Sequence, residues 1–210
     1  MNEEEFQSDE ERYFSWYLEE LKALGYIKEI IHQPKAYPLS SQLNVDYFEP
    51  YKKKEGGKLV SEEILPPHVY TPDVKVIWDD SAIGLFATPL LSQARKKKNR
   101  SFQTIICQQE FKWEESNWKK DPYYSIIEVK PSFDQNNMTR LAKINIKWVW
   151  EKHGDFVNII IPEQHFHKTF TPQKFLLTNK SGQPRKIKYK NIVMLKEFIS
   201  KECNLTGLFT

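Results

Sequence analysis

Cysteine is scarce in this chain of 210 residues, which contains only the isolated Cys107 and Cys203. These residues form neither a CxxC motif nor the framework of a disulfide-rich domain, so a reducing compartment is expected. No run of about 18 consecutive apolar residues is present, and a transmembrane helix needs roughly that length. The first residues, Met-Asn-Glu-Glu-Glu, lack the basic start and apolar segment of a secretory signal. We therefore expect a cytoplasmic protein that does not cross a membrane.

The chain also lacks the glycine-rich signatures of several large enzyme classes. It contains no GxxxxGK[ST] loop, no GxGxxG turn and no GxSxG motif. Nucleotide hydrolysis, dinucleotide redox chemistry and serine esterase chemistry therefore lose their usual sequence support. Hydrophobic residues make up 40% of the chain and charged residues 28%, which is enough apolar material for a real core. The length suits one domain with elaborations, or at most two small domains.

Acidic residues are concentrated at the N-terminus. Residues 1–20 contain eight acidic residues and a single basic one, so the other 190 residues hold 30 of the 31 basic residues and 20 of the 28 acidic ones. Residues 168–201 alone contain nine Lys or Arg and one acid. This basic surplus indicates either a polyanionic partner or an ordinary solvated lysine-rich surface.

The hydrophobic pattern predicts an α/β fold with a mixed sheet. Apolar residues three and four apart from Tyr13 to Leu24 predict a helix that Ser8 caps and Gly25 ends. Further elements are expected as strands at 26–39, 69–78, 101–111, 123–130 and 156–161, as helices at 135–152 and near 191–203, and as a loop or loose hairpin at 40–67. The order of helix, strands, helix and strand is typical of helices layered on a mixed sheet.

Two short motifs contain the residues most suited to chemistry. Glu128 and Lys130 are two positions apart in a predicted strand, so their side chains project from the same face while Val129 points the other way. Asp73 lies in another predicted strand, directly after Pro72, which favours a bend because it cannot donate to a sheet ladder. If the two strands are neighbours, Asp73 converges on the same point.

Two carboxylates at one point repel each other unless a cation joins them. Mg²⁺ or Mn²⁺ suits that role, because these ions prefer oxygen ligands and retain several waters. Lys130 would then orient a water or stabilise charge on a phosphate. Taken singly, Pro72-Asp73 is also an ordinary turn signal, and Glu128-Val129-Lys130 is also a common solvent-facing strand sequence. Their joint position inside apolar strands favours a site.

The arrangement resembles the PD-(D/E)XK nuclease superfamily, whose core is a helix, a short run of strands, a helix and another strand. The likeness extends beyond Asp73, Glu128 and Lys130 to the segments around them. The opening helix and first strand look like those of phage-type and TnsA-like endonucleases in Phe6-x-Ser8-x-x-Glu11, Leu18-Glu19-Glu20-Leu21-x-x-x-Gly25-x-Ile27 and His32-Gln33-Pro34. The closing helix and strand are similar in Thr139-Arg140-Leu141-x-Lys143-x-x-x-Lys147-Trp148 and residues 157–162. About half of the chain is covered.

This resemblance implies a restriction-endonuclease-like core in residues 1–162, with a central mixed sheet flanked by helices, a basic insertion at 79–122 and a basic C-terminal extension at 163–210. It implies Mg²⁺- or Mn²⁺-dependent hydrolysis of DNA phosphodiester bonds, of the junction-resolving or transposon-end type, with a homodimer or a recombinase as partner. The setting would be the cytoplasm of a bacterial or phage-infected cell. The rival interpretation is a non-catalytic nucleic-acid-binding protein or assembly subunit with the same fold.

By the resemblance, Asp73 and Glu128 are metal ligands, Lys130 is the catalytic lysine and Glu11 is a helix carboxylate facing the site. Glu11 has a second interpretation, because Ser8-x-x-Glu11 is also a capping box. Phosphate-backbone contacts are expected from Arg95, Lys96, Lys97, Lys98, Arg100, Lys143, Lys147, Arg185 and Lys186. For the run from Arg95 to Arg100, an exposed loop tip is an equal alternative.

One feature departs from compact members of the superfamily. Asp73 and Glu128 are 55 positions apart, whereas a tight hairpin usually joins the two strands. If the predicted strand at 101–111 paired directly with the Glu128 strand, Asp73 would be displaced. Asp79 or Asp80 would then be the substitute ligand.

Overall fold

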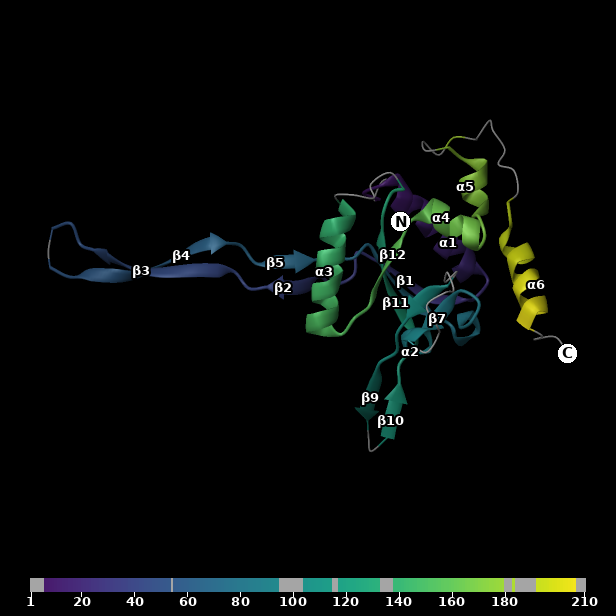
Figure 1. The fold of residues 1–210 in the computed structure, drawn as a ribbon, viewed down its shortest axis with the longest axis horizontal. Coiled ribbons are helices and arrows are strands. Elements are labelled where there is room, and N and C mark those ends of the chain that lie inside the picture. Colours follow the sequence, from purple (N-terminus) through teal and green to yellow (C-terminus); the bar gives the residue numbers. More distant parts are fainter. Residues whose placement is uncertain are drawn as a thin grey trace.

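The computed structural model describes residues 6–53, 55–94, 104–114, 117–132, 138–179, 183 and 192–206. The fold is mixed α/β, with a four-stranded mixed sheet flanked by helices (Figure 1). The elements that form this centre are α1 (Asp9–Ala23), β1 (Ile27–His32), β6 (Val74–Trp78), β11 (Tyr124–Val129), α3 (Met138–His153) and β12 (Val157–Ile160). In the described part of the chain, no helix is long and apolar enough to span a membrane.

Helix α1 begins and ends where its sequence predicts. The Ser8 hydroxyl accepts a hydrogen bond from the Glu11 backbone N–H at 3.2 Å, which satisfies a first-turn donor that has no partner inside the helix. Gly25 follows the last turn with φ of +83°, a conformation that glycine adopts without steric cost. The buried residues of the helix run without a break from Tyr13 to Leu18 and include Leu21, so its middle turns are covered on more than one side.

The central sheet has the strand order β1-β6-β11-β12. Strands β1, β6 and β11 are antiparallel neighbours, whereas β11 and β12 are parallel and are connected through α3. All six residues of β11 are buried, as expected for a central strand covered on both faces. Strand β6 alternates, with Val74, Val76 and Trp78 in the core cluster that contains α1, and Ile77 in the cluster that contains α3.

The predicted strand at 69–78 is divided in the structure. Strand β5 (His68–Tyr70) ends before Pro72, and β6 begins directly after Asp73. The bend expected at Pro72 is therefore confirmed, and the single continuous strand is wrong. The break leaves Asp73 at the very end of a central strand, outside the regular ladder.

The insertion after β6 does not separate the two central strands, because β11 pairs directly with β6. Of the predicted strand at 101–111, the described residues contain β8, which pairs with β7, and Gln108, which follows β8 and forms an isolated bridge with Tyr124 of β11. The run Arg95 to Arg100 lies outside the described residues. The elements of the insertion are η2 (Asp80–Ala82), β7 (Ala87–Pro89), α2 (Leu90–Ala94), β8 (Ile105–Cys107), β9 (Phe111–Glu114) and β10 (Asn117–Lys120).

Among the described residues after β12 there are three helices, α4 (Pro162–Lys168), α5 (Gln173–Leu177) and α6 (Leu195–Thr206). Only α6 corresponds to a predicted helix. Four phenylalanines of this segment belong to the same core cluster as α1: Phe166, Phe170, Phe175 and Phe198. The Phe170 ring stacks on Tyr17 with centroids 4.3 Å apart. Figure 1 accordingly places α4 and α5 beside α1.

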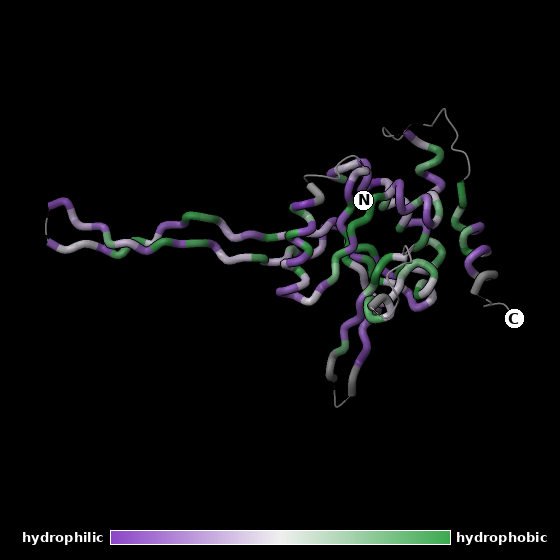
Figure 2. The backbone as a smooth tube through the Cα atoms, in the orientation of Figure 1, coloured by the Kyte–Doolittle hydropathy of each residue, from purple (hydrophilic) through white to green (hydrophobic). Residues whose placement is uncertain are grey.

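A long two-stranded arm projects from the sheet (Figure 1). Its base is β2 (Tyr37–Ser40) paired with β5, and its outer part is β3 (Leu43–Pro50) paired with β4 (Gly57–Leu65). Of the two alternatives expected for residues 40–67, the hairpin is confirmed and the irregular loop is wrong. Strand β3 alternates apolar and polar residues from Leu43 to Tyr47, which favours a β-strand, and Figure 2 shows both hydrophobic and hydrophilic segments along the arm.

Candidate active site

The two motifs meet at one end of adjacent strands. The antiparallel register pairs Ile127 of β11 with Val74 of β6, so the end of β11 lies beside the residue that precedes β6. Asp73 is that residue, and its Oδ2 accepts a hydrogen bond from the Val129 backbone N–H at 2.6 Å. This bond fixes the Asp73 carboxylate across the end of β11.

Glu128 is a buried carboxylate held by both of its oxygens. The Lys130 Nζ lies 2.6 Å from Glu128 Oε1, and the Tyr70 hydroxyl donates to Oε2 at 2.6 Å. Only 6% of the Glu128 surface is exposed. A buried charge requires such partners, and charge-assisted hydrogen bonds are the strong ones. Lys130 and Tyr70 therefore orient Glu128 rigidly.

The electrostatic environment of Asp73 is crowded with negative charge. Burial, followed by the negative charges of Glu128 and Glu11, raises the pKa of Asp73 to about 7. The Val129 N–H and the Lys130 ammonium oppose this rise. Desolvation and neighbouring carboxylates both disfavour the ionised form of an acid. The site thus concentrates three carboxylates around one ammonium group.

Glu11 reaches the same place from the first turn of α1. It lines a small cavity together with Asp73 and His32. Its Oε1 also accepts a hydrogen bond from the Ser8 hydroxyl at 3.0 Å. The capping interaction and a position facing the site are therefore compatible, since the cap holds the carboxylate at the helix end nearest Asp73.

The donor set at this end of the sheet fits a hard divalent cation. Asp73 and Glu128 supply carboxylate oxygens, the ligands that Mg²⁺ and Mn²⁺ prefer. Each oxygen of Glu128 has a second lone-pair direction besides the one directed at Lys130 or Tyr70. Among the residues that the structure describes, no three His, Cys, Asp or Glu side chains are already arranged as a ligand cluster. Two carboxylates plus retained waters are the arrangement that these residues would support.

Asp79 and Asp80, the substitute ligands, lie at the opposite end of β6 from Asp73. Asp79 Oδ1 accepts a hydrogen bond from the Ser81 backbone N–H at 3.0 Å and so caps η2. Asp79 Oδ2 also lies 3.6 Å from the Lys28 ammonium. Asp80 is the first residue of η2. Because strand β6 separates them from Asp73, neither residue belongs to the site.

Of the expected backbone-contacting residues, only two lie within the described residues. Lys143 and Lys147 are exposed one turn apart on α3, the helix that follows β11. Their contact with a nucleic acid stays a prediction. The other seven lie outside the described residues: Arg95, Lys96, Lys97, Lys98, Arg100, Arg185 and Lys186.

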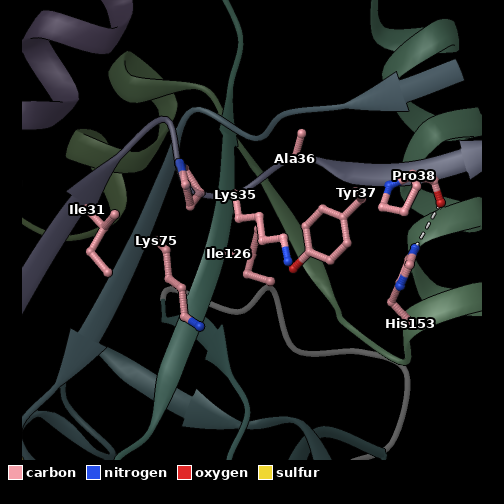
Figure 3. Close-up of a pocket in the computed structure, with 9 residues that line it drawn as sticks. Ile31, Lys35, Ala36, Tyr37, Pro38, Lys75, Ile126 and His153 are labelled. Atoms are coloured by element: carbon pink, nitrogen blue, oxygen red, sulfur yellow. Dashed lines mark hydrogen bonds between the residues drawn. The ribbon is translucent and has the colours of Figure 1, made fainter. Parts of the chain in front are cut away.

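A cavity of about 520 Å³ on the central sheet was not predicted. Lys35, Tyr37, Lys75 and Ile126 are among the residues that line it, and Figure 3 shows them around the sheet face formed by β1, β6 and β11. Lys75 is two positions after Asp73 in the sequence. The sheet register pairs it with Ile126, which belongs to the same strand as Glu128. The alternation along β6 is the sequence signal that could have identified Lys75, because side chains two positions apart in a strand point to the same face.

Tyr70 was also missed as a site residue. It lies three positions before Asp73, and only the bend at Pro72 brings its hydroxyl to Glu128. A tyrosine at that spacing has no sequence signature of its own, since aromatic residues in strands usually serve packing.

Comparisons with known proteins add no family to this description. The chain matches no protein-family model, no curated protein and no solved structure. The functional argument therefore depends on the geometry of the site.

Proposed function

We propose that this protein is a metal-dependent nuclease that hydrolyses DNA phosphodiester bonds at the site formed by Asp73, Glu128 and Lys130. The observation that supports this best is the 2.6 Å pair between Lys130 and Glu128, beside Asp73, at the end of two neighbouring central strands. Two carboxylates and one ammonium are the groups that metal-assisted phosphodiester hydrolysis needs.

The order of elements supports a restriction-endonuclease-like core. Helix α1, strands β1, β6 and β11, helix α3 and strand β12 follow one another in the order implied by the PD-(D/E)XK resemblance, with the arm and the insertion between them. Asp73 directly precedes β6, and Glu128 and Lys130 lie at the neighbouring end of β11, which supports the roles that the resemblance implies for them. We infer that the arm and the insertion are additions to this core.

Each residue of the site has a role in the proposed reaction. A Mg²⁺ or Mn²⁺ ion held by Asp73 and Glu128 would act as a Lewis acid toward the phosphate. The Lys130 ammonium stabilises negative charge that grows on the phosphate oxygens. The Val129 N–H and the Tyr70 hydroxyl keep the two carboxylates oriented. Lys35 and Lys75, which line the cavity on the central sheet, would provide positive charge for a phosphodiester strand.

The first test is cleavage of linear duplex, single-stranded and four-way-junction DNA with Mg²⁺, Mn²⁺ or EDTA. We expect cleavage with either metal and none in EDTA. Asp73→Asn keeps the shape of the side chain but removes the charge, so cleavage should fall by about 10²-fold or more. Asp79→Asn is the matched control, because Asp79 caps η2 at the other end of β6, and it should cleave like the wild type.

DNA affinity measured by fluorescence anisotropy in EDTA separates this proposal from its rival. An enzyme variant such as Asp73→Asn should bind DNA at least as tightly as the wild type. A wild-type protein that binds DNA but cuts none of the three substrates with either metal would instead support the non-catalytic binding protein. A protein that shows no salt-sensitive DNA affinity would support the assembly subunit.

A further inference from the structure

The outer part of the arm, β3 with β4, lies on the surface along its whole length. All eight residues of β3 are exposed, and in β4 only Gly57 and Val60 are partly covered. Within the described residues β4 pairs with β3 alone, so its other edge has free backbone donors and acceptors. An isolated two-stranded ribbon is marginally stable, and a free strand edge is a template for another strand.

The arm also exposes large apolar side chains on both faces. The register pairs Tyr47 with Val60 on one face and Phe48 with Leu59 on the other. Phe48 is 62% exposed and Leu59 is 75% exposed. Figure 2 shows hydrophobic segments along the arm, away from the rest of the chain. An apolar surface of this kind on a thin ribbon indicates a protein partner.

The two edges of the ribbon differ in chemistry. Strand β3 contains Asp46 and Glu49 and no basic residue, and it ends at Pro50, which has no N–H to donate. These features discourage pairing at that edge. Strand β4 contains no proline, and its charges are divided: Lys58 lies near the beginning, and Glu62 and Glu63 lie near the end.

We propose that β4 pairs antiparallel with β4 of a second copy of this chain, about a two-fold axis at Val60. In that register Lys58 of each copy lies directly opposite Glu62 of the other, and the two Val60 side chains face each other. Because Lys58 lies near the beginning of β4 and Glu62 near its end, opposite charges meet only when the two strands run antiparallel. A two-fold axis between identical strands requires that orientation. Opposite charges directly across an antiparallel pair are stabilising.

The pairing would turn two marginal ribbons into one four-stranded sheet in the order β3-β4-β4-β3. On one face Tyr47 and Val60 of each copy would form a continuous apolar row, because cross-strand partners share a face. The two cores would lie at opposite ends of the sheet. Lys58 already pairs with Glu49 of its own chain at 3.1 Å, and its ammonium has three donors, so it can serve both carboxylates. This inference does not depend on the proposed nuclease activity.

Charge reversal tests the register directly. The molar mass of the full chain is measured by analytical ultracentrifugation over a micromolar concentration range, where we expect a wild-type dimer. Lys58→Glu or Glu62→Lys should each raise the dimer dissociation constant about tenfold or more, because two like-charge pairs replace two opposite ones. An equimolar mixture of these two variants should recover the dimer, as should the double variant K58E/E62K.

Glu63→Lys is the matched control, since Glu63 is adjacent to Glu62 but points to the other face and lies opposite Gly57. It should dimerise like the wild type. A monomeric wild type, an equal effect of Glu62→Lys and Glu63→Lys, or a mixture of Lys58→Glu and Glu62→Lys that stays monomeric would each overturn the proposal. Far-UV circular dichroism confirms that every variant is folded.

Discussion

At the scale of single residues, the site depends on how tightly its carboxylates are held. Tyr70 donates a 2.6 Å hydrogen bond to Glu128. Its hydroxyl does not act as an acid, because burial and the charge of Glu128 raise its pKa. It is a positioning residue. The same holds for the Val129 N–H, whose bond to Asp73 is part of the backbone and cannot be removed by mutation of a side chain.

Tyr70→Phe should reduce cleavage at saturating DNA about tenfold and lower the free energy of unfolding by about 1.5–3 kcal/mol, because a buried carboxylate oxygen loses its neutral donor. The measurements are kcat with a fixed duplex and urea unfolding. Tyr124→Phe is the control, since its hydroxyl donates to Asp155 at 2.7 Å and not to Glu128. Equal kcat values for Tyr70→Phe and the wild type would contradict the positioning role.

His165 gives the protein a pH-dependent stability. It is 9% exposed, it packs edge-on against Tyr17, and burial lowers its pKa from 6.5 to about 4, with the charge of Lys168 acting in the same direction. Between those two pH values the unfolded chain binds a proton that the folded chain does not. The contribution of the neutral His165 to the free energy of unfolding is therefore fully present above pH 6.5 and is lost as the pH falls toward 4.

We expect the His165 contribution to fall by about 2 kcal/mol between pH 6.5 and pH 5, since each pH unit in this window costs about 1.4 kcal/mol. The difference in unfolding free energy between the wild type and His165→Met, measured in urea at both pH values, isolates this contribution, because methionine fills the pocket without titrating. The comparison is needed because Asp73, whose pKa is raised to about 7, changes stability with pH in the opposite direction over the same range. The same slope in both proteins would mean that another group causes the dependence.

At the scale of elements, the N-terminal cap of α1 links helix stability to the site. Ser8→Ala removes the acceptor for the Glu11 N–H and the donor to Glu11 Oε1, and it should cost about 1 kcal/mol. The free energy of unfolding checks this, and Ser61→Ala, in the exposed strand β4, is the control. If Glu11 also serves the site, Ser8→Ala should lower kcat beyond what its stability loss explains.

At the scale of the whole molecule, the C-terminal helices are part of the core. A chain that ends after Pro162 would lose four buried phenylalanines that pack on α1 and its neighbours. Each contributes about 1.5–3 kcal/mol, against a total stability of about 5–15 kcal/mol for a typical domain. We expect this truncated protein to lose its cooperative thermal transition, whereas a chain that ends after Thr206 should keep it.

The first helix, the central strands and the closing helix follow from local pattern. Apolar spacing in 13–24 and 138–153, a serine cap and a glycine stop act within a few residues, so the sequence alone predicts them. The same holds for the pair Glu128 and Lys130, because alternation places residues two apart on one face. Asp73 was also predictable as a candidate, because Pro72 predicts a bend directly before it.

Other features depend on contacts between distant residues. That β6 and β11 pair across an insertion, and so bring Asp73 to Val129, is a matter of sheet register, which no local pattern encodes. Tyr70 reaches Glu128 and Lys75 reaches the cavity on the central sheet only through that pairing. Helices α4 and α5, of seven and five residues, are too short to show a helical period, and they form because α1 offers a surface on which Phe166 and Phe175 are buried.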